Sequence, residues 1–169
     1  MDNKKIERKA GDGLVFKNPV KVECFDKDGN LKWSEEEFNI MTDEGLESIL
    51  DVYFSDGSPT GGIGTHYVGL LTATTVAGDT LGTGLDEFTD YTGTRQTWVE
   101  AGVSSKSITN TASPAVFPIT GSGTITGAFL TNVTSGTSGV LICGVDFTSR
   151  AVASGDTVNV TYTLTIADA

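Results

Sequence analysis

The stretch Thr-Val-Asn-Val-Thr-Tyr-Thr-Leu-Thr-Ile-Ala at residues 157–167 decides the fold class, because apolar and polar side chains alternate along it without a break. The apolar set is Val158, Val160, Tyr162, Leu164 and Ile166. The polar set is Thr157, Asn159, Thr161, Thr163 and Thr165. Successive side chains of a β-strand point to opposite faces, so the pattern predicts a strand with one buried and one solvated face, as in an antiparallel sheet.

Shorter segments of the same kind precede this strand. Residues 20–38 are predicted to form a hairpin, because two strand-like runs flank the turn-forming sequence Asp-Lys-Asp-Gly-Asn at 26–30. Further strands are predicted at residues 67–73, 115–120, 123–132 and 140–148. Strands joined by short turns predict a mainly β fold, either an antiparallel β-sandwich or a jelly roll.

One helix is predicted, over residues 42–54. Thr42 or Asp43 can cap its start, and acidic residues fall near the positive end of its dipole. Its apolar residues recur at helical spacing: Leu46, Ile49, Leu50, Tyr53 and Phe54. We expect this stripe to pack on a sheet, and the glycine-rich residues 57–64 to form a loop after it.

Charge divides the chain into two unequal parts. Residues 1–58 hold 8 of the 11 Lys and Arg and 14 of the 22 Asp and Glu, so only 11 charges remain in residues 59–169. Residues 1–18 are charged and show no apolar period, which predicts an N-terminal arm, either a disordered tail or a segment that orders on a partner. Residues 19–169 are predicted to be a single β-sandwich domain.

The overall composition excludes several partners. A pI of 4.3 and a net charge of −11 argue against nucleic acid and against an anionic membrane surface. The charged start of the chain is unlike a signal peptide, and no apolar run is long enough to cross a bilayer, so we expect synthesis in a cytoplasm. Two distant cysteines, Cys24 and Cys143, fit buried small apolar residues better than a disulfide.

Candidate catalytic and metal-binding patterns are weak. Asp26, Asp28 and Asn30 have the spacing of a calcium loop, but Leu31 stands where that loop needs a glycine. His66 is the single histidine and has no nucleophile motif beside it. The acidic residues Asp86, Glu87 and Asp90 are expected to solvate a loop. The sequence therefore predicts neither an enzyme nor a bound cofactor or metal.

Arg95 and Trp98 are the two residues that could anchor an interface. They lie three residues apart in Tyr-Thr-Gly-Thr-Arg-Gln-Thr-Trp at 91–98, where the guanidinium could stack on the indole. Arg and Trp are enriched at binding hot spots. The same pair could equally form a corner inside the domain, and the sequence leaves both alternatives open.

The serial order of several motifs resembles the small capsid cement, or decoration, proteins of tailed bacteriophages. These motifs span roughly residues 40–167 and are Met-Thr-Asp-Glu-Gly-Leu-Glu-Ser-Ile-Leu at 41–50, Tyr-Val-Gly-Leu-Leu-Thr at 67–72, Glu-Phe-Thr-Asp-Tyr-Thr-Gly-Thr-Arg at 87–95 with Trp98, Phe-Pro-Ile at 117–119, Gly-Thr-Ile-Thr-Gly-Ala-Phe-Leu at 123–130 and Ala-Ser-Gly-Asp-Thr at 153–157 with the strand that follows.

The resemblance implies a β-sandwich on the capsid surface of a virion, bound to the outside of a shell of major capsid protein, commonly as a trimer. Similar patterns also occur in tail-fibre-like proteins, so a tail, collar or fibre-adaptor protein is the alternative. A carbohydrate-binding module is a second alternative, because sandwich folds also carry that function.

Overall fold

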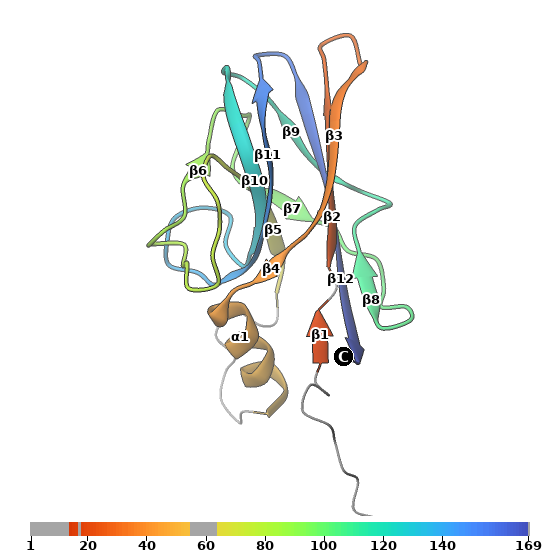
Figure 1. Ribbon diagram of the computed structural model, residues 1–169, viewed down its shortest axis with the longest axis vertical. Coiled ribbons are helices and arrows are strands. Elements are labelled where there is room, and N and C mark those ends of the chain that lie inside the picture. The colour runs from red at the N-terminus through yellow and green to blue at the C-terminus, as the bar shows by residue number, and fades with distance from the viewer. Residues whose placement is uncertain (1–13, 17, 55–63, 169) are drawn as a thin grey trace, which may run out of the picture.

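The computed structural model describes residues 14–16, 18–54 and 64–168 (Figure 1). These residues form two antiparallel sheets that pack face to face and one short helix, so the prediction of a mainly β sandwich is confirmed. The predicted hairpin, the four further strands and the last strand are all present. No helix in the described part of the chain has the length and hydrophobicity needed to cross a membrane.

The first sheet is built around the long last strand, β12. β1 and β2 pair with one edge of this strand, and β3 pairs with the other side of β2. Its strands are β1 (Leu14–Phe16), β2 (Pro19–Phe25), β3 (Leu31–Phe38), β8 (Ser107–Thr109), β9 (Ala115–Pro118) and β12 (Thr157–Asp168). β1 and β2 keep one register against β12, with Leu14 opposite Asp168 and Val20 opposite Tyr162, so they continue one another along β12. β8 and β9 also pair with β12, in successive segments.

The second sheet has the order β4-β11-β10-β5-β6, and β7 also pairs with β5. Its strands are β4 (Ile40–Met41), β5 (His66–Leu71), β6 (Glu87–Phe88), β7 (Gln96–Trp98), β10 (Gly123–Thr131) and β11 (Leu141–Val152). The β10–β11 pairing is the longest in this sheet and contains two register irregularities. Such irregularities bend and twist a strand, which helps a sheet to wrap over its neighbour.

One strand passes from the first sheet to the second. β3 ends at Phe38 and β4 begins at Ile40, so the chain changes sheets at Asn39, whose backbone N–H donates to the carbonyl of Asn18. Earlier in β3, Trp33 Nε1 donates to the carbonyl of Ala151 at 3.2 Å and so links β3 to β11. An ion pair between Arg150 and Glu35 joins the same two strands. A strand that switches sheets closes one open side of a sandwich.

The core lies between the sheets, and β12 supplies its centre. Val158, Val160 and Tyr162 are fully buried, as the alternation predicts. The Tyr162 hydroxyl donates to the carbonyl of Ala128 on β10 at 2.8 Å, so it bridges the two sheets. The burial fades toward the end of the strand, where Ile166 is 39% exposed.

The helix α1 (Asp43–Phe54) begins as predicted, because the Thr42 hydroxyl accepts the backbone N–H of Gly45 at 3.1 Å. Its packing differs from the prediction at Leu46, whereas the side chains of Leu50, Tyr53 and Phe54 from the same predicted stripe lie outside the described residues. Gly45 lies so close to β11 that an added Cβ would collide with the carbonyl oxygen of Ile142, and Ser48 is also buried. Leu46, which belongs to the predicted apolar stripe, is 38% exposed, because the small residues make the close contact instead.

The first sheet begins inside the segment predicted as the arm. Residues 14–16 of that segment form β1, and the Asn18 side-chain oxygen accepts the backbone N–H of Thr165 at 2.8 Å. Residues 1–13 of the predicted arm and residues 57–63 of the predicted loop lie outside the described residues.

Candidate functional site

The first sheet presents a face that points away from the second sheet, here called the outer face. Its positions follow from the register. Val20, Val22 and Cys24 of β2 are buried against the core, so Lys21 and Glu23 between them point outward. In the cross-strand rows, Lys21 lies between Glu36 and Thr161, and Glu23 lies between Ser34 and Asn159. The row through Asn159 continues to Val116 on β9.

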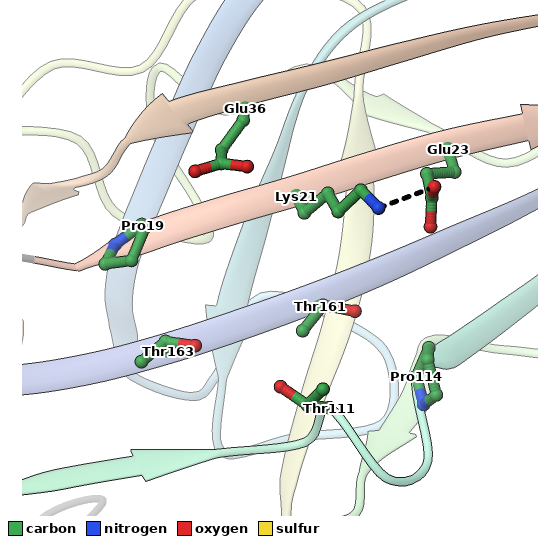
Figure 2. A pocket seen from close by; sticks show the side chains of 8 residues that line it. All are labelled: Pro19, Lys21, Glu23, Glu36, Thr111, Pro114, Thr161 and Thr163. Carbon is green, nitrogen blue, oxygen red and sulfur yellow. Dashed lines mark ion pairs between the residues drawn. The ribbon is translucent and has the colours of Figure 1, made fainter.

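A groove of about 320 Å³ runs across this outer face. Figure 2 shows the side chains that line it, which are Pro19, Lys21, Glu23, Glu36, Thr111, Pro114, Thr161 and Thr163. β2 and β12 form its floor. Thr111 and Pro114 belong to the loop between β8 and β9 and form a wall.

This wall exists because β12 changes partner there. β8 pairs with Thr163–Thr165 and β9 with Thr157–Val160, and the chain between them leaves the sheet. Asn110 replaces the missing strand: its side chain donates to the carbonyl of Val160 at 3.1 Å and accepts the backbone N–H of Tyr162 at 2.8 Å. Asn110 is fully buried, so these two hydrogen bonds hold the loop in place against β12.

The electrostatics of the outer face are mild. Lys21 Nζ lies 2.7 Å from Glu23 Oε1, so these two charges offset one another and leave Glu36 as the unbalanced charge of the groove (Figure 2). The outward residues of β12 are uncharged. Hydroxyl groups bond across the strands, with Thr163 to Thr109 at 2.9 Å and Thr165 to Ser107 at 3.0 Å. Cross-strand hydroxyl pairs of this kind stabilise a sheet.

This arrangement is suited to binding by shape and hydrogen bonds. Carboxylate, lysine and hydroxyl groups are present, but the described lining holds no histidine or cysteine that could serve as a base or nucleophile. Within residues 14–16, 18–54 and 64–168, no three His, Cys, Asp or Glu side chains come close enough together to hold one metal ion.

The turn at residues 26–30, whose spacing resembles that of a calcium loop, has a structural role. The Asp26 carboxylate accepts the backbone N–H groups of Asp28 at 2.9 Å and Asn30 at 2.8 Å, together with the Asn30 side-chain amide. These hydrogen bonds, that of the Asn30 side chain foremost, lower the pKa of Asp26. The carboxylate therefore shapes the β2–β3 turn, where Gly29 takes a φ of +83°.

Arg95 and Trp98 are both buried inside the chain, at 6% and 4% exposure, which supports the second alternative, a corner within the domain. Arg95 pairs with Glu87 through two hydrogen bonds, Nε to Oε1 at 3.0 Å and Nη2 to Oε2 at 2.9 Å. Its guanidinium stacks on Phe129, 5.1 Å from the ring centroid, and not on Trp98. Arg95 also donates to the carbonyls of Val133 and Gly136 in the β10–β11 loop.

The acidic cluster of the sequence therefore divides in the structure. Asp86 and Asp90 have exposed side chains, as a solvating role requires. Glu87 is half-buried and is the partner of Arg95, so for this residue the expectation of simple solvation was wrong. Its partner lies eight residues away, across a turn that the sequence pattern did not resolve.

The two cysteines are buried and form no disulfide, in agreement with the prediction. Burial raises the pKa of Cys24 to about 11, and the adjacent Asp156 carboxylate adds to the effect. Burial raises the pKa of Cys143 to about 12. Both side chains therefore stay as thiols at neutral pH and pack as small apolar groups.

His66 is the first residue of β5 and lies against Trp98. The two ring centroids are 6.1 Å apart and the rings meet edge-on. Burial lowers the pKa of His66 from its ordinary value, and the nearby Glu100 carboxylate opposes this only in part. His66 therefore remains neutral at neutral pH.

Acidification is expected to destabilise the protein through His66. The unfolded chain takes up the histidine proton at about pH 6.5, whereas the folded chain takes it up at a lower pH. The contribution of neutral His66 to stability is therefore complete above the pKa that the residue has in the unfolded chain. It is lost as the pH falls from that value through the lower pKa of the folded chain. Urea unfolding, followed by tryptophan fluorescence between about pH 5 and 8, measures it. His66→Gln should flatten this part of the profile; a variant with the slope of the wild type would contradict the assignment.

The sequence predicted part of the groove. Alternation placed Thr161 and Thr163 on the solvated face of the last strand, and Lys21 and Glu23 alternate with buried residues of β2 in the same way. Thr111 and Pro114 were not singled out. The available signal was the turn-forming sequence Asn-Thr-Ala-Ser-Pro at 110–114, which indicates a break in the strand but not the direction in which the loop leaves the sheet.

No family model matches the chain, and no curated protein matches it significantly. Fold and site define the class of protein on their own. The described residues form a β-sandwich whose first sheet has a polar outer face with a groove across it.

Proposed function

We propose that this chain is a non-enzymatic structural protein of a tailed-phage virion, a cement or decoration protein that binds the outside of the major capsid protein shell as a homotrimer. It is made in the host cytoplasm and resides on the capsid surface. The observation that carries the proposal is the outer face of the first sheet, which is broad, polar and nearly free of unbalanced charge. The order of sequence motifs between residues 40 and 167 supports the same class.

The physical argument concerns adhesion. A face whose charges are few and paired can approach another protein surface without a large desolvation penalty, and its hydroxyl groups can hydrogen-bond to whatever they meet. The Asn110 side chain and the cross-strand hydroxyl pairs hold the face rigid, so binding orders few side chains. Many copies of such a contact, each weak, add up across a shell.

The acidic character of the rest of the chain fits this place. A net charge of −11 disfavours contact with packaged DNA, and DNA occupies the inside of a shell. A protein of the outer surface meets capsid protein instead.

Binding to shells that lack this protein tests the proposal. Purified protein is added to such shells, and the bound fraction is measured by co-sedimentation. The wild type should saturate at hundreds of copies per shell. Thr161→Arg, which puts a charge on the groove floor, should weaken binding by about tenfold or more, the equivalent of about 1.4 kcal/mol.

Thr148→Arg is the matched control, because Thr148 is exposed on β11 of the second sheet. It should bind as the wild type does. No binding by the wild type would contradict the proposal, and loss of binding in Thr148→Arg alone would move the contact to the other sheet. About a dozen copies or fewer in mature virions would favour the tail, collar or fibre-adaptor function.

A further inference from the structure

The inner face of the first sheet extends beyond the second sheet. Tyr162 is the last fully buried residue of β12; Leu164 is half-buried and Ile166 is 39% exposed. Figure 1 shows the end of β12, close to the C-terminus, reaching past the strands of the second sheet. Side chains that alternation assigns to the core therefore emerge into solvent at this end.

A hairpin next to β12 widens this apolar surface. Ile108 of β8 lies opposite Leu164. Ser104 and Ser107 exchange two backbone hydrogen bonds, both at 2.9 Å, and the N–H of Ala101 donates to the carbonyl of Thr109 at 2.8 Å, so the segment that holds Val103 runs alongside β8. Val103 is 74% exposed, more than any other large apolar side chain among the described residues. Val103, Ile108, Leu164 and Ile166 are together called the apolar overhang.

The apolar overhang is preformed. Ser105 and Lys106 have φ angles of 51° and 65°, so they form a two-residue turn in the left-handed region. Residues other than glycine adopt this conformation at an energetic cost. The backbone N–H of Ile166 donates to the carbonyl of Lys106 at 3.1 Å, which fixes the tip of the hairpin to β12. A rigid surface loses little conformational entropy when it binds.

Charge indicates what covers the apolar overhang. Residues 101–115 carry one charge, that of Lys106, and residues 157–167 carry none. The whole chain has a net charge of −11, so two copies repel one another over most of their surfaces and approach most easily here. The segment 1–13 makes a poor cover, because 7 of its 13 residues are charged: Asp2, Lys4, Lys5, Glu7, Arg8, Lys9 and Asp12.

We propose that the apolar overhang is the surface by which this chain binds a second copy of itself. Exposed apolar side chains in a charge-poor zone are the usual mark of a protein–protein contact. The contact is separate from the outer face, which points in the opposite direction and stays free to bind another surface. The inference rests on the proposed function in one respect, because that function requires an oligomer. The surface itself follows from burial, register and charge.

The mass of the full chain in solution tests the inference. Sedimentation equilibrium or light scattering should give two or three times the chain mass of 17.7 kDa for the wild type. Val103→Glu and Ile166→Glu should each shift the mass to that of the monomer. Val76→Glu, at a residue that is 59% exposed outside the apolar overhang, should keep the mass of the wild type. Circular dichroism confirms that each variant is folded.

A wild type that is monomeric at its highest soluble concentration would overturn the inference. So would folded Val103→Glu and Ile166→Glu variants that keep the mass of the wild type, or an equal loss in Val76→Glu, which would assign the effect to added charge alone. Co-sedimentation with shells is measured in parallel. An oligomer that binds no shell leaves the inference standing and removes the proposed function. A monomer that binds shells overturns the inference and the homotrimer, and leaves binding to the capsid shell standing.

Discussion

Replacing Arg95 with methionine is expected to lower the free energy of unfolding by about 3–5 kcal/mol, the range for breaking a buried ion pair. Arg95 is 6% exposed and bonds to Glu87 and to two loop carbonyls. The substitution leaves both carbonyl oxygens without this donor, and it leaves the half-buried carboxylate with only the Tyr91 hydroxyl, at 3.4 Å. It also removes the stacking on Phe129. Urea or guanidinium unfolding measures the loss.

Two controls separate the ion pair from the loss of a side chain. Lys27→Met removes an exposed partner of Asp28 and should change stability by less than about 1 kcal/mol. The double variant Arg95→Met, Glu87→Leu should recover much of the loss, because no buried charge is then left unpaired. If Arg95→Met matched Lys27→Met, the corner would not depend on this pair.

Tyr162→Ala is expected to cost a similar amount, about 3–5 kcal/mol, the range for removing a large buried aromatic side chain. Tyr162 is fully buried at the centre of β12 and bridges to the carbonyl of Ala128 on β10. Burial raises the pKa of Tyr162 well above its ordinary value, so the hydroxyl keeps its proton at neutral pH and can donate this hydrogen bond.

The hydroxyl and the ring can be weighed separately. Tyr162→Phe keeps the ring and should cost about 1 kcal/mol, the net contribution of one hydrogen bond. Val116→Ala changes a 43% exposed side chain on the neighbouring strand β9 and should stay within about 0.5 kcal/mol of the wild type. A loss in Tyr162→Ala no larger than that in Val116→Ala would show that β12 does not hold the core together.

The sequence predicted those parts of the fold that depend on neighbours along the chain. The alternation of residues 157–167 gave the central strand, the turn residues at 26–30 gave the hairpin, and Thr42 gave the start of the helix. Each is a local rule: strand periodicity, turn chemistry or capping.

The remaining parts depend on tertiary contacts that no local rule contains. Ile166 fits the apolar pattern but emerges into solvent because the second sheet ends before it. Leu46 fits the helical stripe but is exposed because Gly45 brings the helix onto β11 by another side. Strands of two or three residues, such as β6 and β8, are too short to show a period.

The candidate site shows the same division. The polar outer face follows from alternation in β12, so it could be predicted. The groove needs the outward loop at 110–114, which depends on the contacts of Asn110 with a strand about 50 residues away. The Arg95–Glu87 pair needs the β10–β11 loop to complete it, so the sequence left the role of Arg95 open.

A cryo-EM map of shells incubated with this protein tests the central claim most directly. We predict sandwich-shaped density at regular positions on the outside of the shell, with the first sheet turned toward the capsid protein and Thr161 at the contact. Shells that carry no added density would contradict the account, and so would sandwiches bound with that sheet turned to solvent.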